Sequence, residues 1–119
     1  MRPVGGTTPR AGRSGWAAPL LFALVAIAVF LPAWTDPTKR WIGESGDAEL
    51  YLWFLSWTPH ALGSGLNPFY STAINHPLGV NLAWNTQLFL PGVVLAPITA
   101  WLGPIAAYNF MVTAALALD

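Results

Sequence analysis

The sequence contains no cysteine and very little charge. Without cysteine, no disulfide framework and no thiolate metal site can form. Only 8% of the residues are charged, whereas soluble domains carry about 25%. Five Lys and Arg residues balance five Asp and Glu residues, so there is no basic surface for nucleic acid. These absences argue against a disulfide scaffold, a nucleic-acid binder and an ordinary soluble domain.

Charge is missing altogether from residues 50–118, where His60 and His76 are the only side chains that titrate near neutral pH. In contrast, 55% of the chain is hydrophobic and seven residues are Trp, which favours the membrane–water interface. High apolar content with little charge is the opposite of the composition of disordered chains. The composition therefore predicts an all-α integral membrane protein.

Residues 16–34 form the first long uncharged segment and have Trp at both ends. As a helix they would be about 28 Å long, close to the ~30 Å hydrocarbon core of a bilayer. A cleaved signal peptide is the competing interpretation, but the segment is longer than the usual apolar region and no small-x-small cleavage site follows. We therefore expect a transmembrane helix over 16–34, preceded by a disordered cytoplasmic tail over 1–15.

The positive-inside rule gives the expected orientation, because three arginines precede the first span: Arg2, Arg10 and Arg13. Residues 35–103 would then form an extracytoplasmic loop. Helical patterns over 47–63 and 87–101 predict two interfacial helices in this loop. The second is 15 residues long, so both a span and a membrane-parallel position stay open. Residues 104–119 would begin the second transmembrane helix of a longer multi-pass bundle.

No glycine-rich phosphate loop, nucleophile elbow or zinc-protease motif occurs. Asp47 is the strongest candidate for chemistry, because it follows Gly46 at the start of a predicted helix. It fits two roles, a helix N-cap and a functional carboxylate. The other polar candidates of the same loop are Glu44, Glu49, His60, Asn75 and His76.

Each of these candidates also has a plain structural role. Glu49 suits a first-turn acid that complements the helix dipole, and His60 suits an interfacial histidine as well as a ligand. His76-Pro77 is typical of a turn, and Asn75 is suited to satisfying backbone groups in a loop.

Several short motifs follow one another along the chain: Gly46-Asp47, Trp53 and Trp57, Asn67-Pro68-Phe69-Tyr70, His76-Pro77-Leu78-Gly79, Pro91 and Pro97, Gly103-Pro104, and Ala107-Tyr108-Asn109. As a set, this pattern resembles the N-terminal region of polytopic GT-C-type glycosyltransferases of bacteria, over about residues 16–118. Those enzymes use polyprenyl-phosphate-linked sugars, and their first outer loop carries an acidic residue and two helices lying along the membrane.

The resemblance implies that Asp47 is the loop acid, which acts as general base or helps to bind a divalent metal, Mg²⁺ or Mn²⁺. Many members have two neighbouring acids here, where this sequence has Asp47-Ala48-Glu49. Glu49, His60, Asn75 and His76 become candidates for substrate binding. Lys39 and Arg40 are candidates for binding the donor phosphate, although later segments of a longer protein are favoured for that role.

The predicted function is therefore the N-terminal part of a membrane glycosyltransferase at the outer face of the plasma membrane, inactive as a fragment. Its expected partners are membrane lipid, a polyprenyl-phosphate sugar and the remaining transmembrane segments. The alternatives are a non-enzymatic transporter or flippase subunit and a membrane-anchored structural protein. A transporter places polar groups within its spans. Here the polar groups lie in the predicted outer loop, which favours the enzyme.

Overall fold

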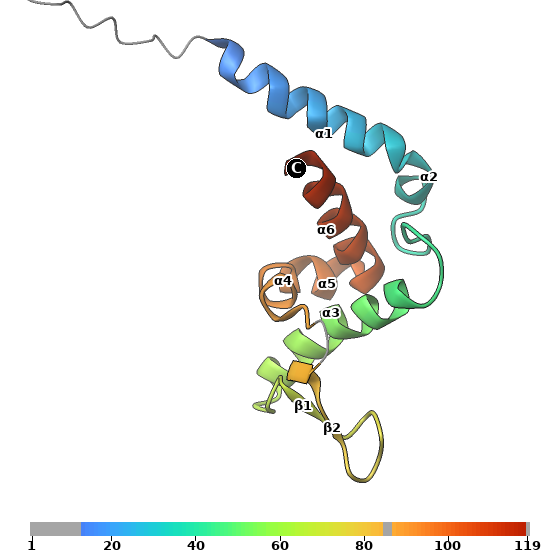
Figure 1. The fold of residues 1–119 in the computed structure, drawn as a ribbon, viewed down its shortest axis with the longest axis vertical. Coiled ribbons are helices and arrows are strands. Elements are labelled where there is room, and N and C mark those ends of the chain that lie inside the picture. Colours follow the sequence, from blue (N-terminus) through green and yellow to red (C-terminus); the bar gives the residue numbers. More distant parts are fainter. Residues whose placement is uncertain (1–12, 85–86, 119) are drawn as a thin grey trace, which may run out of the picture.

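The computed structural model describes residues 13–84 and 87–118, which form helices and one short β-hairpin (Figure 1). The elements in chain order are η1 (Arg13–Trp16), α1 (Ala17–Val29), α2 (Leu31–Trp34), α3 (Asp47–Gly63), β1 (Tyr70–Ser71), β2 (Val80–Asn81), η2 (Leu82–Trp84), α4 (Phe89–Val94), α5 (Ala96–Leu102) and α6 (Pro104–Leu118). Most of the predicted tail over 1–15 lies outside the described residues, and its last residues belong to η1.

The prediction of an integral membrane fold with transmembrane helices over 16–34 and 104–119 is wrong. Across the parts of the chain that the structure describes, no helix combines the length and the apolarity needed to cross a membrane. α1 has 13 residues and α6 has 15, so they reach roughly 20 Å and 22 Å against a hydrocarbon core of ~30 Å.

The apolar segment 16–34 is interrupted at Phe30, whose backbone (φ −97°, ψ 16°) leaves the helical conformation between α1 and α2. Pro32 gives the physical reason, because it has no N–H to donate to the carbonyl of Ala28. The segment 87–101 is interrupted in the same way. It forms α4 and α5 with a break at Leu95, and Pro97 lies in the first turn of α5.

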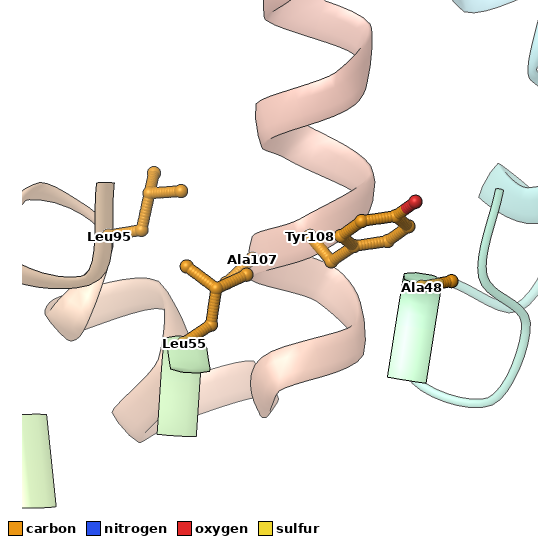
Figure 2. Close-up of a cluster of buried hydrophobic side chains, with 5 residues drawn as sticks. All are labelled: Ala48, Leu55, Leu95, Ala107 and Tyr108. Carbon is orange, nitrogen blue, oxygen red and sulfur yellow. The ribbon is translucent and has the colours of Figure 1, made fainter. Parts of the chain in front are cut away.

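Four helices pack together at the centre of the molecule (Figure 1). α3 contacts α4, α5 and α6, and α6 also lies alongside α1. One cluster of buried hydrophobic side chains among them comprises Ala48, Leu55, Leu95, Ala107 and Tyr108 (Figure 2). The segments that were expected to lie separately along a membrane are therefore parts of one helical cluster.

α3 and α4 lie in close contact where Gly92 meets Thr58. A Cβ atom added at Gly92 would lie 2.7 Å from the Cβ of Thr58, which is shorter than any normal contact. Thr58 is fully buried, and its hydroxyl has no hydrogen-bond partner among the described residues. Glycine is thus needed here for the helices to touch.

We expect Gly92→Ala to lower the free energy of unfolding by about 1–3 kcal/mol, the usual cost of overpacking. Adding Thr58→Ala should recover only part of this loss, because it removes Oγ1 and Cγ2, at 2.9 Å and 3.1 Å from the added atom, and the unpaired hydroxyl, but keeps the Cβ at 2.7 Å. Denaturant unfolding followed by Trp fluorescence measures both effects. Gly63→Ala is the matched control, since its added Cβ would meet nothing within 4 Å. Equal stability of the Gly92 and Gly63 variants would contradict the predicted close contact.

Candidate functional site

The loop between α2 and α3, residues 35–46, carries the candidate site and is held against α6 by Asn109. The amide nitrogen Nδ2 of Asn109 donates to the carbonyls of Arg40 at 2.7 Å and Pro37 at 3.4 Å. Its Oδ1 accepts from the backbone N–H of Ile42 at 3.0 Å. The Asn109 side chain is fully buried, and a buried amide needs such partners. One side chain therefore fixes the path of the loop.

Two glycines direct the end of this loop into α3. Gly43 (φ 94°) and Gly46 (φ 112°) both adopt a backbone conformation that other residues rarely tolerate. Gly46 is the N-cap residue of α3, and no side chain in the described parts of the chain caps the first turn with a hydrogen bond. Asp47 is therefore the first residue within the helix and not its cap.

Asp47 lies in an open depression of about 440 Å³, lined by Gly43, Glu44, Ser45, Gly46, Asp47, Ala48 and Tyr108. Tyr108 comes from α6, and its ring stacks on that of Tyr51 with the ring centres 6.5 Å apart. Burial raises the pKa of the Tyr108 hydroxyl, with further contributions from Tyr51 and from the negative charge of Asp47. The depression thus combines an acceptor, the Asp47 carboxylate, with a hydroxyl that is protonated at neutral pH.

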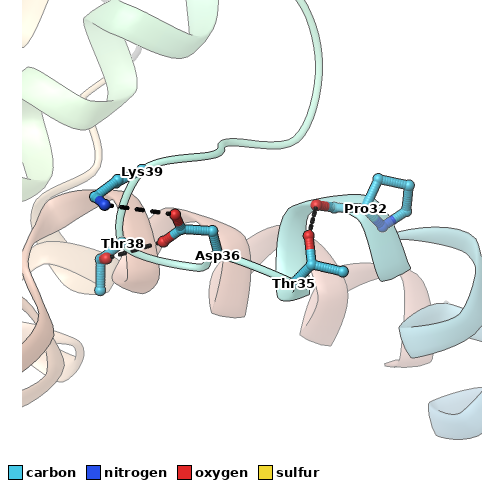
Figure 3. Close-up of polar contacts among 5 residues, drawn as sticks. All are labelled: Pro32, Thr35, Asp36, Thr38 and Lys39. Atoms are coloured by element: carbon cyan, nitrogen blue, oxygen red, sulfur yellow. Dashed lines mark hydrogen bonds and ion pairs between the residues drawn. The ribbon is translucent and has the colours of Figure 1, made fainter.

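A second depression, of about 370 Å³, lies on the same loop and contains two cationic residues, Lys39 and Arg40. Its lining also includes Gly43 and Ser45, which line the Asp47 depression as well. Lys39 forms an ion pair with Asp36 at 3.8 Å, and Thr38 donates to the same carboxylate (Figure 3). The loop therefore carries acidic and basic groups on neighbouring hollows.

A third depression, of about 220 Å³, is apolar and continues from the second toward α1. It shares four lining residues with the basic depression and adds three apolar ones. The shared residues are Pro32, Ala33, Trp41 and Gly43, and the added ones are Val29, Phe30 and Ile42. Along the surface, the acidic, the basic and the apolar depression therefore follow one another in this order.

Glu49 and His60 do not join Asp47. Glu49 is exposed in the first turn of α3 and does not line the depression. His60 lies thirteen residues further along the same helix, roughly 20 Å away, with its ring beside that of Trp57. The structure therefore separates both residues from the predicted acid.

Asn75 and His76 lie in the connection between β1 and β2, far from the loop before α3 (Figure 1). Asn75 has a positive φ of 56°. Its side chain donates to the carbonyl of Gly79 at 3.2 Å, and its own carbonyl accepts from the Gly79 N–H. These contacts give Asn75 a role in the turn and do not bring it or His76 to Asp47.

The described residues include no group of three or more His, Asp or Glu side chains arranged to hold a metal ion. Glu44 and Asp47 line the same depression and are the two carboxylates nearest to such a role. A Mg²⁺ or Mn²⁺ ion at Asp47 stays a prediction.

Tyr108 and Asn109 are the residues that the site analysis of the sequence left out, although both belong to the Ala107-Tyr108-Asn109 motif. For Asn109, the feature that could have identified it in the sequence is its amide, which lies within an uncharged helical segment. Such a group must find hydrogen-bond partners once it is buried. Its partners lie 67 to 72 residues away, so the pattern alone could not name them.

Comparisons with family profiles, with curated proteins and with solved structures give no match to this chain.

Proposed function

We propose that this chain is the N-terminal part of an enzyme that transfers a sugar from a polyprenyl-phosphate-linked donor to an acceptor hydroxyl. The single observation that carries the proposal is the adjacency of the three depressions on the loop before α3. Asp47 and the two cationic residues face hollows that share Gly43 and Ser45. The resemblance of the motif set to GT-C-type enzymes supports the same reaction.

The proposed chemistry assigns one task to each hollow. The Asp47 carboxylate takes the proton of the acceptor hydroxyl as its oxygen forms a bond to the anomeric carbon of the sugar. The bond from that carbon to the phosphate oxygen breaks, and polyprenyl phosphate leaves with the electron pair. Lys39 and Arg40 stabilise the negative charge of the departing phosphate. Because the donor is a lipid, the reaction takes place at the surface of the plasma membrane.

The apolar hollow would receive the first part of the polyprenyl chain. Val29, Phe30 and Ile42 provide its apolar lining, and apolar surface favours hydrocarbon over water. An amphiphilic donor could therefore bind with its phosphate at the two cationic residues and its polyprenyl chain in the apolar depression toward α1.

The test is transfer of radiolabelled sugar from polyprenyl-phosphate donors by the full-length protein in isolated membranes. Label should pass from the lipid fraction to a water-soluble or polymeric product. Membranes from cells without the protein are the control. Equal transfer with and without the protein, across donors with different sugars, would contradict the proposal.

Arg40→Gln is expected to raise the KM for the lipid-linked donor by roughly 10- to 100-fold. A hydrogen bond to a charged group contributes about 1.5–3 kcal/mol, which corresponds to that range. Arg40→Lys is the matched control, since it keeps the charge and should retain most of the affinity. The difference between the two variants should shrink as salt is added. An unchanged donor KM in Arg40→Gln would remove the phosphate role from this residue.

A further inference from the structure

The first turn of α3 has backbone donors without partners among the described residues. Leu50 makes the first backward hydrogen bond of the 17-residue helix, to the carbonyl of Gly46 at 3.3 Å. The N–H groups of Asp47, Ala48 and Glu49 come before it, and no side-chain cap bond is made at this helix start. Asp47 and Ala48 line the open depression, so donors are available at its floor.

Tyr108 supplies an independent observation on the opposite wall of the depression. The residue is only 7% exposed, and its hydroxyl makes no hydrogen bond to any residue in the described parts of the chain. Figure 2 shows the ring reaching from α6 toward Ala48, with the hydroxyl at its far end. The residue is buried, but its oxygen atom is not among the fully buried unpaired polar atoms of the described residues, so it is accessible from the depression. It lines that depression together with Asp47, where it can form a hydrogen bond to a ligand.

We propose that the Tyr108 hydroxyl, the Asp47 carboxylate and the free N–H groups of α3 bind neighbouring hydroxyl groups of a saccharide. This inference rests on the proposed function. It identifies the acceptor substrate, which would bind in the Asp47 depression, as a sugar. It makes Tyr108 a binding residue that orients the acceptor hydroxyl toward the Asp47 carboxylate.

The mixture of groups favours a sugar over an anion. Each sugar hydroxyl both donates and accepts a hydrogen bond, so it can donate to the Asp47 carboxylate and accept from Tyr108 or a backbone N–H. An anion would accept from the same donors, but it would also meet the negative charges of Glu44 and Asp47 on the lining. A tyrosine hydroxyl has an ordinary pKa of about 10, which burial raises further for Tyr108, so this hydroxyl is protonated and can donate at neutral pH.

A direct binding test observes the tyrosines of this chain, Tyr51, Tyr70 and Tyr108. Single Tyr→Phe variants assign their signals in the fluorine NMR spectrum of the 3-fluorotyrosine-labelled full-length protein. D-mannose, D-galactose and D-glucose serve as probes. At least one should shift the Tyr108 signal and leave Tyr70 unchanged. No shift with any of the three overturns the proposal, and so does an equal or larger shift with inorganic phosphate.

Kinetics separate this proposal from the function on which it rests. Tyr108→Phe keeps the ring and its stacking on Tyr51, and it should raise the acceptor KM about tenfold with little change in kcat, as expected for one lost hydrogen bond. Tyr51→Phe removes a hydroxyl outside the depression and should leave the acceptor KM unchanged. If Tyr108→Phe also leaves it unchanged while Asp47→Asn is inactive, the saccharide site is wrong and the proposed function stands.

Discussion

Asp47→Asn is expected to lower sugar transfer by the full-length protein about 10²–10⁴-fold, the usual loss when a positioned general base is removed. Asparagine keeps the size of aspartate but cannot accept the proton of the acceptor. The substitution should leave stability almost unchanged, because Gly46 is the N-cap and no side chain caps the first turn of α3. Initial rates of transfer from a radiolabelled polyprenyl-phosphate donor measure the loss.

Glu49→Gln is the matched control for this prediction. Glu49 lies two residues after Asp47 and about 200° around the helix, outside the depression. Like Asp47→Asn, Glu49→Gln removes one carboxylate from the first turn of α3, so any general effect of charge on the helix would appear in both variants. Near-normal turnover of Asp47→Asn, or an equal loss in Glu49→Gln, would show that Asp47 is not the base.

Asn109→Leu is expected to lower the free energy of unfolding by about 2 kcal/mol. Leucine has a similar size but no polar atoms, so the N–H of Ile42 and the carbonyl of Arg40 lose their partner. A polar group left unpaired in a buried environment costs about 1–3 kcal/mol, and both of these hydrogen bonds are partly buried. The loop before α3 would also lose its attachment to α6, so transfer activity should fall with stability. Urea unfolding followed by Trp fluorescence measures the change in stability.

Asn81→Leu is the control for the same chemical change at an exposed position. Oδ1 of Asn81 accepts from the N–H of Ala83 at 3.0 Å on the surface, where water can replace the lost partner. Its cost should stay within about 0.5 kcal/mol, as is usual for surface substitutions. If both asparagine variants lose the same stability, Asn109 does not fix the loop.

The sequence predicted individual helices better than it predicted their continuity. A helix was expected over 47–63, and α3 covers Asp47–Gly63, because glycines flank a helical pattern there. The segment 16–34 was expected to be one span, yet it breaks at Phe30. Hydropathy over a window reports how apolar a segment is. It does not report whether Pro32 ends the hydrogen-bond ladder within that segment, and so the length of the helix was overestimated.

The candidate site was likewise predicted only in part from the sequence. The sequence singled out Asp47, because an acid between a glycine and an apolar helix is unusual in a chain with so little charge. It also grouped Asp47 with His60, Asn75 and His76, since all lie in one predicted loop. Neighbourhood along the chain does not give neighbourhood in space, and α3 holds His60 at one end and Asp47 at the other.

By itself, the sequence determined the lack of cysteine chemistry, the helical character and the position of an acid after a conformationally free glycine. These properties depend on composition and on patterns a few residues long. Only the tertiary structure decided that Tyr108 faces Asp47 and that Asn109 fixes the loop before α3. Those contacts join α6 to a loop some 67 residues earlier. They form because the packing of α6 against α3 and α1 buries apolar surface, and patterns a few residues long cannot predict contacts between segments so far apart in the sequence.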